Sequence, residues 1–359
     1  MTRLLSISAD RSKMGVLVPG SAAYARQKAY AEKLGGLDII GFSLQSDHFA
    51  EAHDGALHAY PTRSVTKFLY GLNAIFIAAK LPWPDVVSVQ DPFETGLVGL
   101  LVSHFVGKPL HVQVHTDFLS PEYARLSLAN RLRVWMAGIV LKRATRVRVV
   151  SERIRISIQT RYELNVPVTV LPIYVDVGKI RTTAPNPTLS ARFEEYSKRL
   201  LYVGRLEQEK HPCLALRAFA QAAPGDACLI VVGAGSEAAH LRHLAEELGV
   251  TDRVFFEGVA DAIPYYLLAD LILVTSRYEG YGLVIVEALA AAKPVLSTDV
   301  GIAREAGAIV TSEKDYADTL KKWFSDGPRE GRLFDYPYVH FDDYVSAYCA
   351  DIKACIEAE

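Results

Sequence analysis

Short runs of β-branched and apolar residues alternate with longer, helix-like segments along almost the whole chain. In the first half the strand-like runs are residues 4–8, 38–44, 85–90, 110–115 and 146–150, with helical patterns at 21–34, 65–80, 94–105, 128–142 and 151–162. The second half repeats the rhythm with strand-like runs at 200–204, 227–233, 253–258, 271–276 and 294–298. Strands separated by helices pair in parallel, because a crossover needs a connection of about a dozen residues. The chain is therefore predicted to be α/β, with helices covering both faces of its sheets.

One interruption divides this rhythm. Between Val175 and Lys198 the chain carries Pro185, Pro187 and polar residues where the next strand–helix unit would stand, a composition typical of a linker. A closed eight-fold barrel would share the alternation but not the break, so two doubly wound domains fit better. The predicted boundaries are 1–178 for the first domain, 179–198 for the linker, 199–337 for the second domain and 338–359 for a final helix that packs back on the first domain.

Composition narrows the classes of protein. Half of the 359 residues are hydrophobic and the net formal charge is -2, which excludes global disorder and a protein that coats nucleic acid. Residues 1–180 carry +7 and residues 181–359 carry -9, so the halves are expected to have different partners. The four cysteines form no C-x-x-C pair, and no apolar run reads as a signal peptide or spans a bilayer. These features predict a soluble cytoplasmic protein with reduced thiols.

The most informative stretch is Thr275–Leu296. A buried strand ends at Ser276, the turn Glu279–Gly282 follows, and a helix starts near Leu283. In open α/β sheets ligands bind at the carboxyl ends of strands, and glycines there let backbone N–H groups approach an anion. Glu287 lies inside the otherwise apolar helix, where a carboxylate needs donors such as ligand hydroxyls. The alternative is that Glu279 is a loop acid and Glu287 reaches solvent.

A second strand end carries positive charge. Gly204 and Arg205 follow the strand residues 200–203, and Lys210 comes five residues after Arg205. A guanidinium fork with an ammonium group suits a diphosphate. Ordinary surface ion pairs are the alternative for each cation.

Together these motifs resemble the retaining GT-B glycosyltransferases of family 4, the glycosyl transferases group 1. Their C-terminal domain binds a nucleotide-diphospho-sugar through a G-R-x-x-x-x-K turn and two glutamates with seven residues between them. Gly204–Lys210 and Glu279–Glu287 match both patterns. The matching pieces that stand in the expected order are Gly233-Ala-Gly235, Val254–Gly258 and Ala292–Val295, and the resemblance covers about Leu200–Val310. It implies two Rossmann-like domains facing a cleft.

The resemblance also implies roles. Arg205 and Lys210 would neutralise the diphosphate, Glu287 would bind ribose hydroxyls and Glu279 would hold the transferred sugar. The implied donor-binding set is Gly204, Arg205, Lys210, Gly233, Gly258, Glu279, Gly280, Tyr281, Gly282, Leu283 and Glu287. The implied catalytic set is His115, Arg205, Lys210 and Glu279. The expected enzyme is a hexosyltransferase that uses a UDP- or GDP-sugar with retention and acts in polysaccharide or glycoconjugate assembly. No cofactor is expected, and no metal, because protein cations replace it and the D-x-D signature is absent.

The first half supplies candidates for the acceptor side. His115 ends the strand at 110–115, matching a histidine that family members place near the donor sugar, and Asp117 is a weaker candidate beside it. A histidine satisfied by backbone is the structural alternative. Asp91 and Glu94 follow another strand and start a helix, where capping is an equal explanation. Where many members carry a Gly-Gly turn, this chain has Gly20 and Ser21, which can still open a helix toward phosphate.

The segment Arg125–Arg161 holds ten Lys and Arg residues and one acid, mixed with large apolar residues. Such a run is usually a solvated face. It also suits docking on anionic lipid, which predicts peripheral association with the inner face of the plasma membrane and a glycan or lipid-linked acceptor. Nucleic acid is not an expected partner, because no base-stacking motif accompanies the charge.

Three other functions remain open at this stage. A sugar-nucleotide epimerase could share the GT-B fold. An NAD-dependent dehydrogenase would rest on Gly233–Ala238, which matches G-x-G-x-x-A but follows the second strand of its domain, so that a tight turn with close helix packing is favoured. A non-catalytic sugar- or lipid-binding protein would leave the paired glutamates and cations unexplained.

Overall fold

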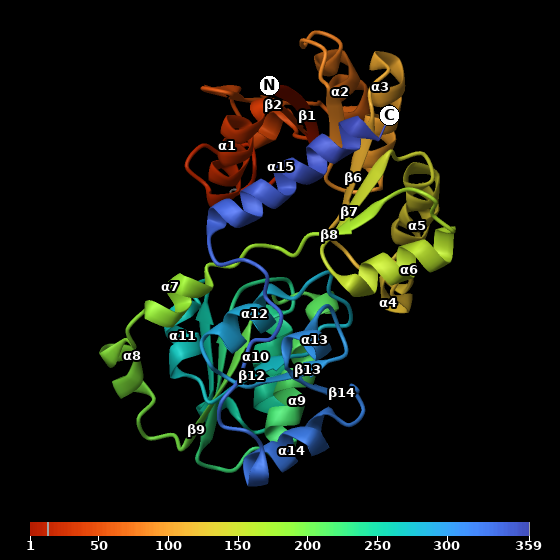
Figure 1. Ribbon diagram of the computed structural model, residues 1–359. Helices are drawn as coiled ribbons and strands as arrows, with labels where there is room; N and C mark the ends of the chain where they lie inside the picture. The colour runs from red at the N-terminus through yellow and green to blue at the C-terminus, as the bar shows by residue number, and fades with distance from the viewer. Residues whose placement is uncertain (13, 359) are drawn as a thin grey trace. The chain divides into compact units, whose positions relative to one another are not determined.

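The computed structural model describes residues 1–12 and 14–358, and these divide into two compact units. One unit holds residues 1–172 together with 340–359, and the other holds residues 173–339. Each contains a largely parallel sheet with helices packed against it (Figure 1), which confirms the predicted α/β class with two Rossmann-like folds.

The first unit is built on a sheet with the strand order β3-β4-β2-β1-β5-β6-β7-β8. Its strands are β1 (Thr2–Ser8), β2 (Gly35–Gly41), β3 (Ala52–Asp54), β4 (Leu57–Pro61), β5 (Val86–Val89), β6 (Leu110–Val114), β7 (Arg146–Val149) and β8 (Val168–Val170). Its helices before the second unit are α1 (Ala22–Leu34), α2 (Tyr70–Ala78), α3 (Glu94–Val106), α4 (Pro121–Leu126), α5 (Leu128–Leu141) and α6 (Glu152–Tyr162). All neighbouring strands pair in parallel except β3 and β4. Strands β3, β4 and β8 were not predicted from the sequence, because their short runs give little periodic signal.

The second unit has the order β11-β10-β9-β12-β13-β14, with every pair parallel. Its strands are β9 (Lys198–Val203), β10 (Ala227–Val232), β11 (Val254–Gly258), β12 (Leu271–Val274), β13 (Val295–Thr298) and β14 (Ile309–Thr311). Its main helices are α9 (Pro212–Ala222), α10 (Ala238–Glu247), α11 (Ile263–Leu268), α12 (Leu283–Ala290), α13 (Ala303–Ala306) and α14 (Tyr316–Asp326). The chain runs outward from β9 through β11 and then returns to β12 on the other side of β9. The strand order therefore reverses between β9 and β12, where ligands bind in folds of this kind.

The segment predicted as a linker is structured. Residues 179–198 carry most of α7 (Val177–Thr182), all of α8 (Pro187–Arg192) and the first residue of β9, and they belong to the second unit. Asn186 caps α8 through its side chain, and Pro187 occupies the first helical position, where its missing N–H costs nothing. The proline that suggested a break therefore starts a helix.

The last helix, α15 (Phe341–Glu357), returns to the first unit as predicted and packs against α1 (Figure 1). Tyr348 stacks on Tyr30 of α1 with ring centroids 4.1 Å apart. Asp351 of α15 is almost fully buried, and its two carboxylate oxygens accept from His111 at 3.0 Å and from Arg146 at 2.5 Å. Burial alone would raise the pKa of Asp351, but these donors outweigh it and lower the pKa to about 2.

Removing this charge is expected to loosen α15. Asp351→Asn leaves Arg146 without its buried counter-charge and should lower the free energy of unfolding by about 3 kcal/mol in urea denaturation. Because the folded pKa lies below the unfolded value, the wild type should lose this stabilisation as the pH falls from about 4 toward 2, and the variant should not. The control is Asp342→Asn on the same helix, whose partner Lys33 is exposed and whose loss should change stability little. Equal effects of the two changes would contradict this role for Asp351.

Candidate active site

Two loops meet where the strand order of the second unit reverses. One follows β9 and contains the 3-10 turn Gln208–Lys210, and the other follows β12 and leads into α12. Thr275, directly after β12, donates its hydroxyl to the carbonyl oxygens of Lys210 and His211 at 3.1 and 2.9 Å. The backbone N–H of Arg277 donates to the carbonyl of Glu209 at 2.9 Å. These bonds fix the first loop on the second and bring the two predicted motifs together.

Lys210 and Glu279 form an ion pair across these loops. The Lys210 Nζ lies 2.5 Å from Glu279 Oε1, which also accepts from the Ser276 hydroxyl at 2.7 Å. Both charged side chains are mostly buried, with 22% and 16% of their surface exposed. The pair therefore places one positive and one negative group, both largely shielded from solvent, at the carboxyl end of β12.

Arg205 lies in the same loop but in a different setting. Its side chain is 69% exposed and pairs with Glu209, four residues later in the loop, at 2.7 Å. The surface-pair alternative therefore describes Arg205 in this structure. Such an exposed pair is weak, so a phosphate can draw the guanidinium away at small cost.

Glu287 is held from an element that the sequence analysis did not connect with it. The hydroxyl of Tyr266, on α11, donates to Glu287 Oε2 at 2.7 Å. Burial raises the pKa of Glu287, and the Tyr266 hydrogen bond opposes that rise. The sequence signals that a carboxylate within an apolar helix needs a donor, but not that Tyr266, 21 residues earlier, provides one.

The glycines after β9 and β10 let two loops pack backbone against backbone. A Cβ on Gly233, at φ +144°, would lie 1.9 Å from the carbonyl oxygen of Gly204, and one on Gly235 would lie 2.3 Å from that of Leu206. The N–H of Gly233 donates to the carbonyl of Gly258 at 2.7 Å. Gly233–Ala238 is thus a tight turn, as predicted, although the close packing is with the neighbouring loop rather than with a helix.

The turn before α12 presents backbone at the same sheet edge. Gly282, at φ +97°, precedes the first helical residue Leu283, and no side chain in the described part of the chain caps this helix. The ring of Tyr281 is buried, and its carbonyl accepts from the N–H of Ile302 at 3.0 Å. N–H groups of an uncapped first turn suit an anion.

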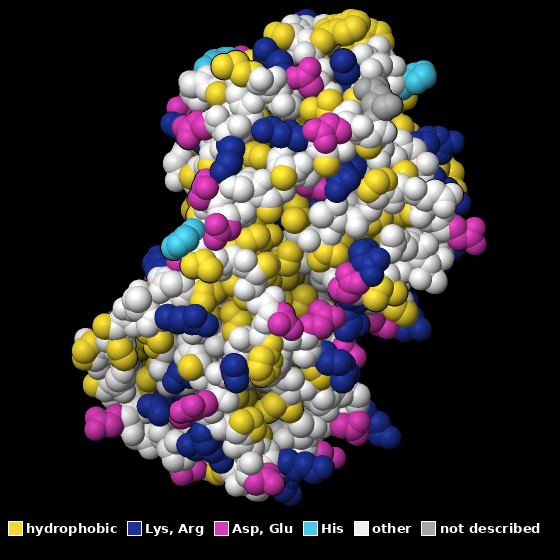
Figure 2. Space-filling view, viewed as in Figure 1, with side chains coloured by type: hydrophobic (Ala, Val, Ile, Leu, Met, Phe, Trp, Pro, Cys, Tyr) yellow, Lys and Arg dark blue, Asp and Glu magenta, His cyan; other side chains and the backbone are white. Residues whose placement is uncertain are grey.

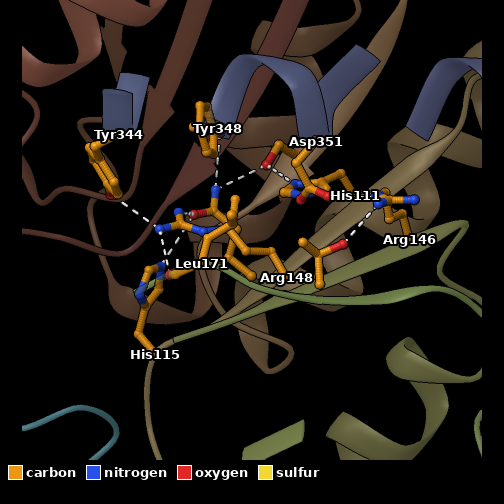
Figure 3. A network of polar contacts seen from close by, with 11 residues as sticks. His111, His115, Arg146, Arg148, Leu171, Tyr344, Tyr348 and Asp351 are labelled. Carbon is orange, nitrogen blue, oxygen red and sulfur yellow. Dashed lines mark hydrogen bonds and ion pairs between the residues drawn. The ribbon is translucent and has the colours of Figure 1, made fainter. Parts of the chain in front are cut away.

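In the first unit, His115 follows β6 and bonds to Gln113 through its Nε2 at 3.2 Å. Figure 3 shows the surrounding network, in which Arg148 donates to the same Gln113 Oε1 at 2.8 Å. Arginine only donates, so Oε1 is an acceptor and the His115 Nε2 must carry the hydrogen. Burial, then the charge of Arg148, lowers the pKa of His115 to about 3, so this imidazole is neutral with Nδ1 as its acceptor.

The same logic orients the rest of the network as far as α15. Gln113 Nε2 donates to Ser88 at 3.1 Å, and the Ser88 hydroxyl then donates to His111 Nδ1 at 2.9 Å. His111 Nε2 consequently carries a hydrogen and donates to Asp351. The buried Arg148 also donates to Tyr344 of α15 at 3.1 Å. The last helix thus holds Arg148 in place, and Arg148 bonds to Gln113, which in turn orients His115.

Three of the predicted acceptor-side residues, Gly20, Ser21 and Glu94, have structural roles in this unit. Ser21 caps α1, accepting from the N–H of Tyr24 at 3.0 Å, and its hydroxyl donates to the carbonyl of Gly15, while Gly20 precedes it at φ +85°. Glu94 is exposed and paired with Arg133 of α5 at 2.9 Å.

The two aspartates are closer to what a binding site needs. Asp91 accepts from the N–H of Phe93 at 2.8 Å, and burial raises its pKa to about 6. Burial also raises the pKa of Asp117, against the charge of Arg153. Neither carboxyl group is fully open to solvent, and burial favours the neutral form of each.

The basic run Arg125–Arg161 is not one surface. Arg146 and Arg148 lie within the network around α15, and Arg125, Arg133 and Arg155 pair with Glu122, Glu94 and Glu152. The exposed cations that remain include Arg131, Lys142, Arg143 and Arg161.

Comparisons with known proteins agree for both units. The family model for glycosyl transferases group 1 matches residues 190–336, and that for the glycosyl transferase 4-like domain matches residues 20–173. The chain is 30% identical over 266 residues to 2-deoxystreptamine glucosyltransferase of Streptomyces kanamyceticus, covering 67% of this chain and 68% of that one. It is 39% identical over 140 residues to D-inositol 3-phosphate glycosyltransferase of Mycolicibacterium smegmatis, a match that spans 35% of this chain and only 32% of the relative.

Solved structures support the fold over almost the full length. Anabaena HepE in complex with UDP and glucose superposes with a TM-score of 0.68 at 20% identity, covering 99% of this chain and 95% of that one. Sucrose-phosphate synthase from Thermosynechococcus elongatus gives a TM-score of 0.73 at 18% identity, with 99% and 94% coverage. At these identities the likeness concerns the two-domain GT-B fold.

The loop packing generates a prediction. Gly233→Ala drives a methyl group into the Gly204 carbonyl and should lower the free energy of unfolding by about 3 kcal/mol, measured by chemical denaturation. Gly225→Ala is the matched control, since its added methyl meets nothing within 4 Å. A variant at Gly233 as stable as the control would show that the two loops do not need this close approach.

Proposed function

The chain belongs to the glycosyl transferases group 1, family-4 glycosyltransferases of the GT-B type, and we propose that it moves a hexose from a nucleotide-diphospho-sugar to a glycan or lipid-linked acceptor with retention. The observation that carries the proposal is the Lys210–Glu279 pair at the reversal of strand order, because both motif halves meet there. The similar structure of Anabaena HepE contains UDP and glucose, which makes UDP-glucose the first donor to test.

The pair suggests how donor binding exchanges partners. A diphosphate presents more negative charge to Lys210 than one carboxylate does, so the ammonium moves to the phosphate. Glu279, released from Lys210 but still held by Ser276, then accepts from hydroxyls of the transferred sugar. Arg205 leaves its weak pair with Glu209 for the same diphosphate.

Transfer then depends on stabilising the leaving group. Charge develops on the diphosphate as the anomeric bond breaks, and Lys210, Arg205 and the first-turn N–H groups of α12 are the groups proposed to stabilise it. The protein cations make the reaction independent of a metal. Glu287, held by Tyr266, binds the ribose hydroxyls, and the leaving phosphate takes the acceptor proton.

The first unit is proposed to bind the acceptor. His115 is neutral, and because its Nε2–H is bonded to Gln113, its Nδ1 is the atom that can accept from a sugar hydroxyl. Asp91, Asp117 and the turn at Gly20 and Ser21 are the further acceptor-side candidates. Glu94 takes part only if it leaves Arg133.

The other functions considered from the sequence lose their support here. The dehydrogenase rested on Gly233–Ala238, whose glycines serve the packing of two loops. None of the relatives described above is named as an epimerase. A binding protein without catalysis has no need for a buried pair at this edge.

The central test removes each charge of the Lys210–Glu279 pair in turn and compares the effect with the loss of another mostly buried ion pair of the same unit. Lys210→Ala and Glu279→Gln should each lower the rate of sugar transfer about 100-fold or more. The rate is measured by mass spectrometry with a panel of UDP- and GDP-sugars as donors. Asp270→Asn is the control, since it breaks the similarly buried Arg199–Asp270 pair at the opposite end of the strands and should leave transfer unchanged.

Nucleotide binding separates the two roles in the same proteins. UDP or GDP should raise the melting temperature of the wild type and of Glu279→Gln, because Glu279 contacts the sugar, but should act much less on Lys210→Ala. Stabilisation by NAD and by neither nucleoside diphosphate would refute the proposed function.

We also propose that the first unit docks on an anionic membrane. Helices α2, α3 and α5 lie side by side, and their outer faces leave Leu72, Phe76, Leu101, Phe105, Leu128, Leu132 and Trp135 exposed. Figure 2 shows hydrophobic side chains at the edge of this unit, near α2 and α3. Exposed Lys67, Lys80, Arg131, Lys142 and Arg143 flank them on or next to the same helices. No helix in the described part of the chain has both the length and the apolar content to cross a bilayer.

Vesicle flotation tests this surface. The double change Phe76→Ser and Phe105→Ser should abolish flotation with vesicles that contain an anionic phospholipid, while neutral vesicles should bind the wild type poorly. Val259→Ser, which changes an even more exposed apolar residue of the second unit, is the control. Unchanged flotation of the double variant, or binding insensitive to salt, would rule out docking through these helices.

A further inference from the structure

Three side chains of types that can bind metal ions meet on the surface of the second unit, between α9 and α10. Cys213 lies in the first turn of α9, Glu237 precedes α10, and His240 lies in the first turn of α10. Their ligand atoms all lie within 4.8 Å of one another. The Cys213 Sγ is 3.9 Å from Glu237 Oε2 and 3.8 Å from His240 Nδ1, and those last two atoms are 3.2 Å apart.

These separations are close to those of a zinc site. With a Zn–S bond of about 2.3 Å and Zn–N and Zn–O bonds of about 2.0 Å, tetrahedral angles place sulfur about 3.5 Å from each lighter atom. The same bonds place nitrogen and oxygen about 3.3 Å apart. Each observed separation differs from these values by no more than about 0.4 Å, which small side-chain rotations supply.

The donor set also selects the metal. One thiolate and one carboxylate neutralise a divalent ion, and the imidazole completes three ligands of the kinds that zinc accepts. A thiolate disfavours Mg²⁺ and Ca²⁺, which prefer oxygen ligands. His240 is 58% exposed, so water can occupy the fourth position.

We propose that Cys213, Glu237 and His240 bind one Zn²⁺ per chain. This site lies outside the proposed donor-binding residues and does not depend on the transfer activity. Burial, and then the charge of Glu237, raises the pKa of the Cys213 thiol, so binding replaces the S–H bond by a Zn–S bond and releases the proton to solvent.

The position of the ligands indicates what the ion does. Cys213 follows Lys210 by three residues, and the N–H of Glu237 donates to the carbonyl of Leu206 at 2.8 Å. Glu207 accepts from the N–H and hydroxyl of Ser236 at 3.1 and 2.6 Å. A zinc ion would thus tie α9 to α10 directly behind the two loops that pack through Gly204 and Gly233, and would stabilise that junction.

The test is zinc binding by the purified full-length chain in competition with a chromophoric chelator. The wild type should bind one zinc ion, and Cys213→Ser and His240→Ala should each weaken binding about 100-fold or more, since loss of outer partners alone costs 10–100-fold. The matched control is His243→Ala. This change removes a neighbouring histidine that pairs with Glu246 and Glu247 and does not belong to the cysteine-containing cluster.

Cobalt provides a direct signature of the ligand set. Co²⁺ should give a thiolate-to-cobalt charge-transfer band in the wild type and His243→Ala, and the band should disappear in Cys213→Ser. Zinc should also raise the melting temperature of the wild type but not of His240→Ala. Absence of competition with the chelator, or a charge-transfer band that survives in Cys213→Ser, would overturn the proposal, whatever the outcome of the transfer assays.

Discussion

Parallel pairing around β9 is the constraint on which the functional site depends. Because every strand of the second unit points the same way, all carboxyl ends lie at one edge, and the chain reverses its strand order beside β9. Thr275 and Arg277 then bond to the loop after β9, so Lys210 meets Glu279 although 69 residues separate them. The ion pair is a consequence of sheet topology, and its chemistry is available only because the backbone bonds place it.

Much of this arrangement could be predicted from the sequence, for identifiable reasons. The alternation of strands and helices is a local pattern, and Gly204–Lys210 and Glu279–Glu287 keep their spacing within single loops. Prediction failed where a residue's environment is set from far away. Tyr266 bonds to Glu287 from another helix. Arg148 belongs to the basic run but is buried, and nothing in the neighbouring sequence indicates that burial.

The cysteine–histidine–glutamate cluster shows the same limit. Cys213 and His240 lie on different helices and match no ligand spacing, so the cysteine pattern predicted only reduced thiols and no metal site. The prediction of an unstructured linker failed for a different reason. Pro185 and Pro187 suggest a break in the alternation of strands and helices, but a proline at the first position of a helix gives the same signal.

The return of α15 to the first unit has a consequence for the order of folding. Residues 173–339 form a unit inserted between the sheet that α15 covers and α15 itself. During synthesis the second unit is therefore complete before the partners of Arg148 and His111 on α15, Tyr344 and Asp351, leave the ribosome. Until then Arg148 and His111 lack their final hydrogen-bond acceptors, so the first unit cannot complete its buried network before α15 has been made.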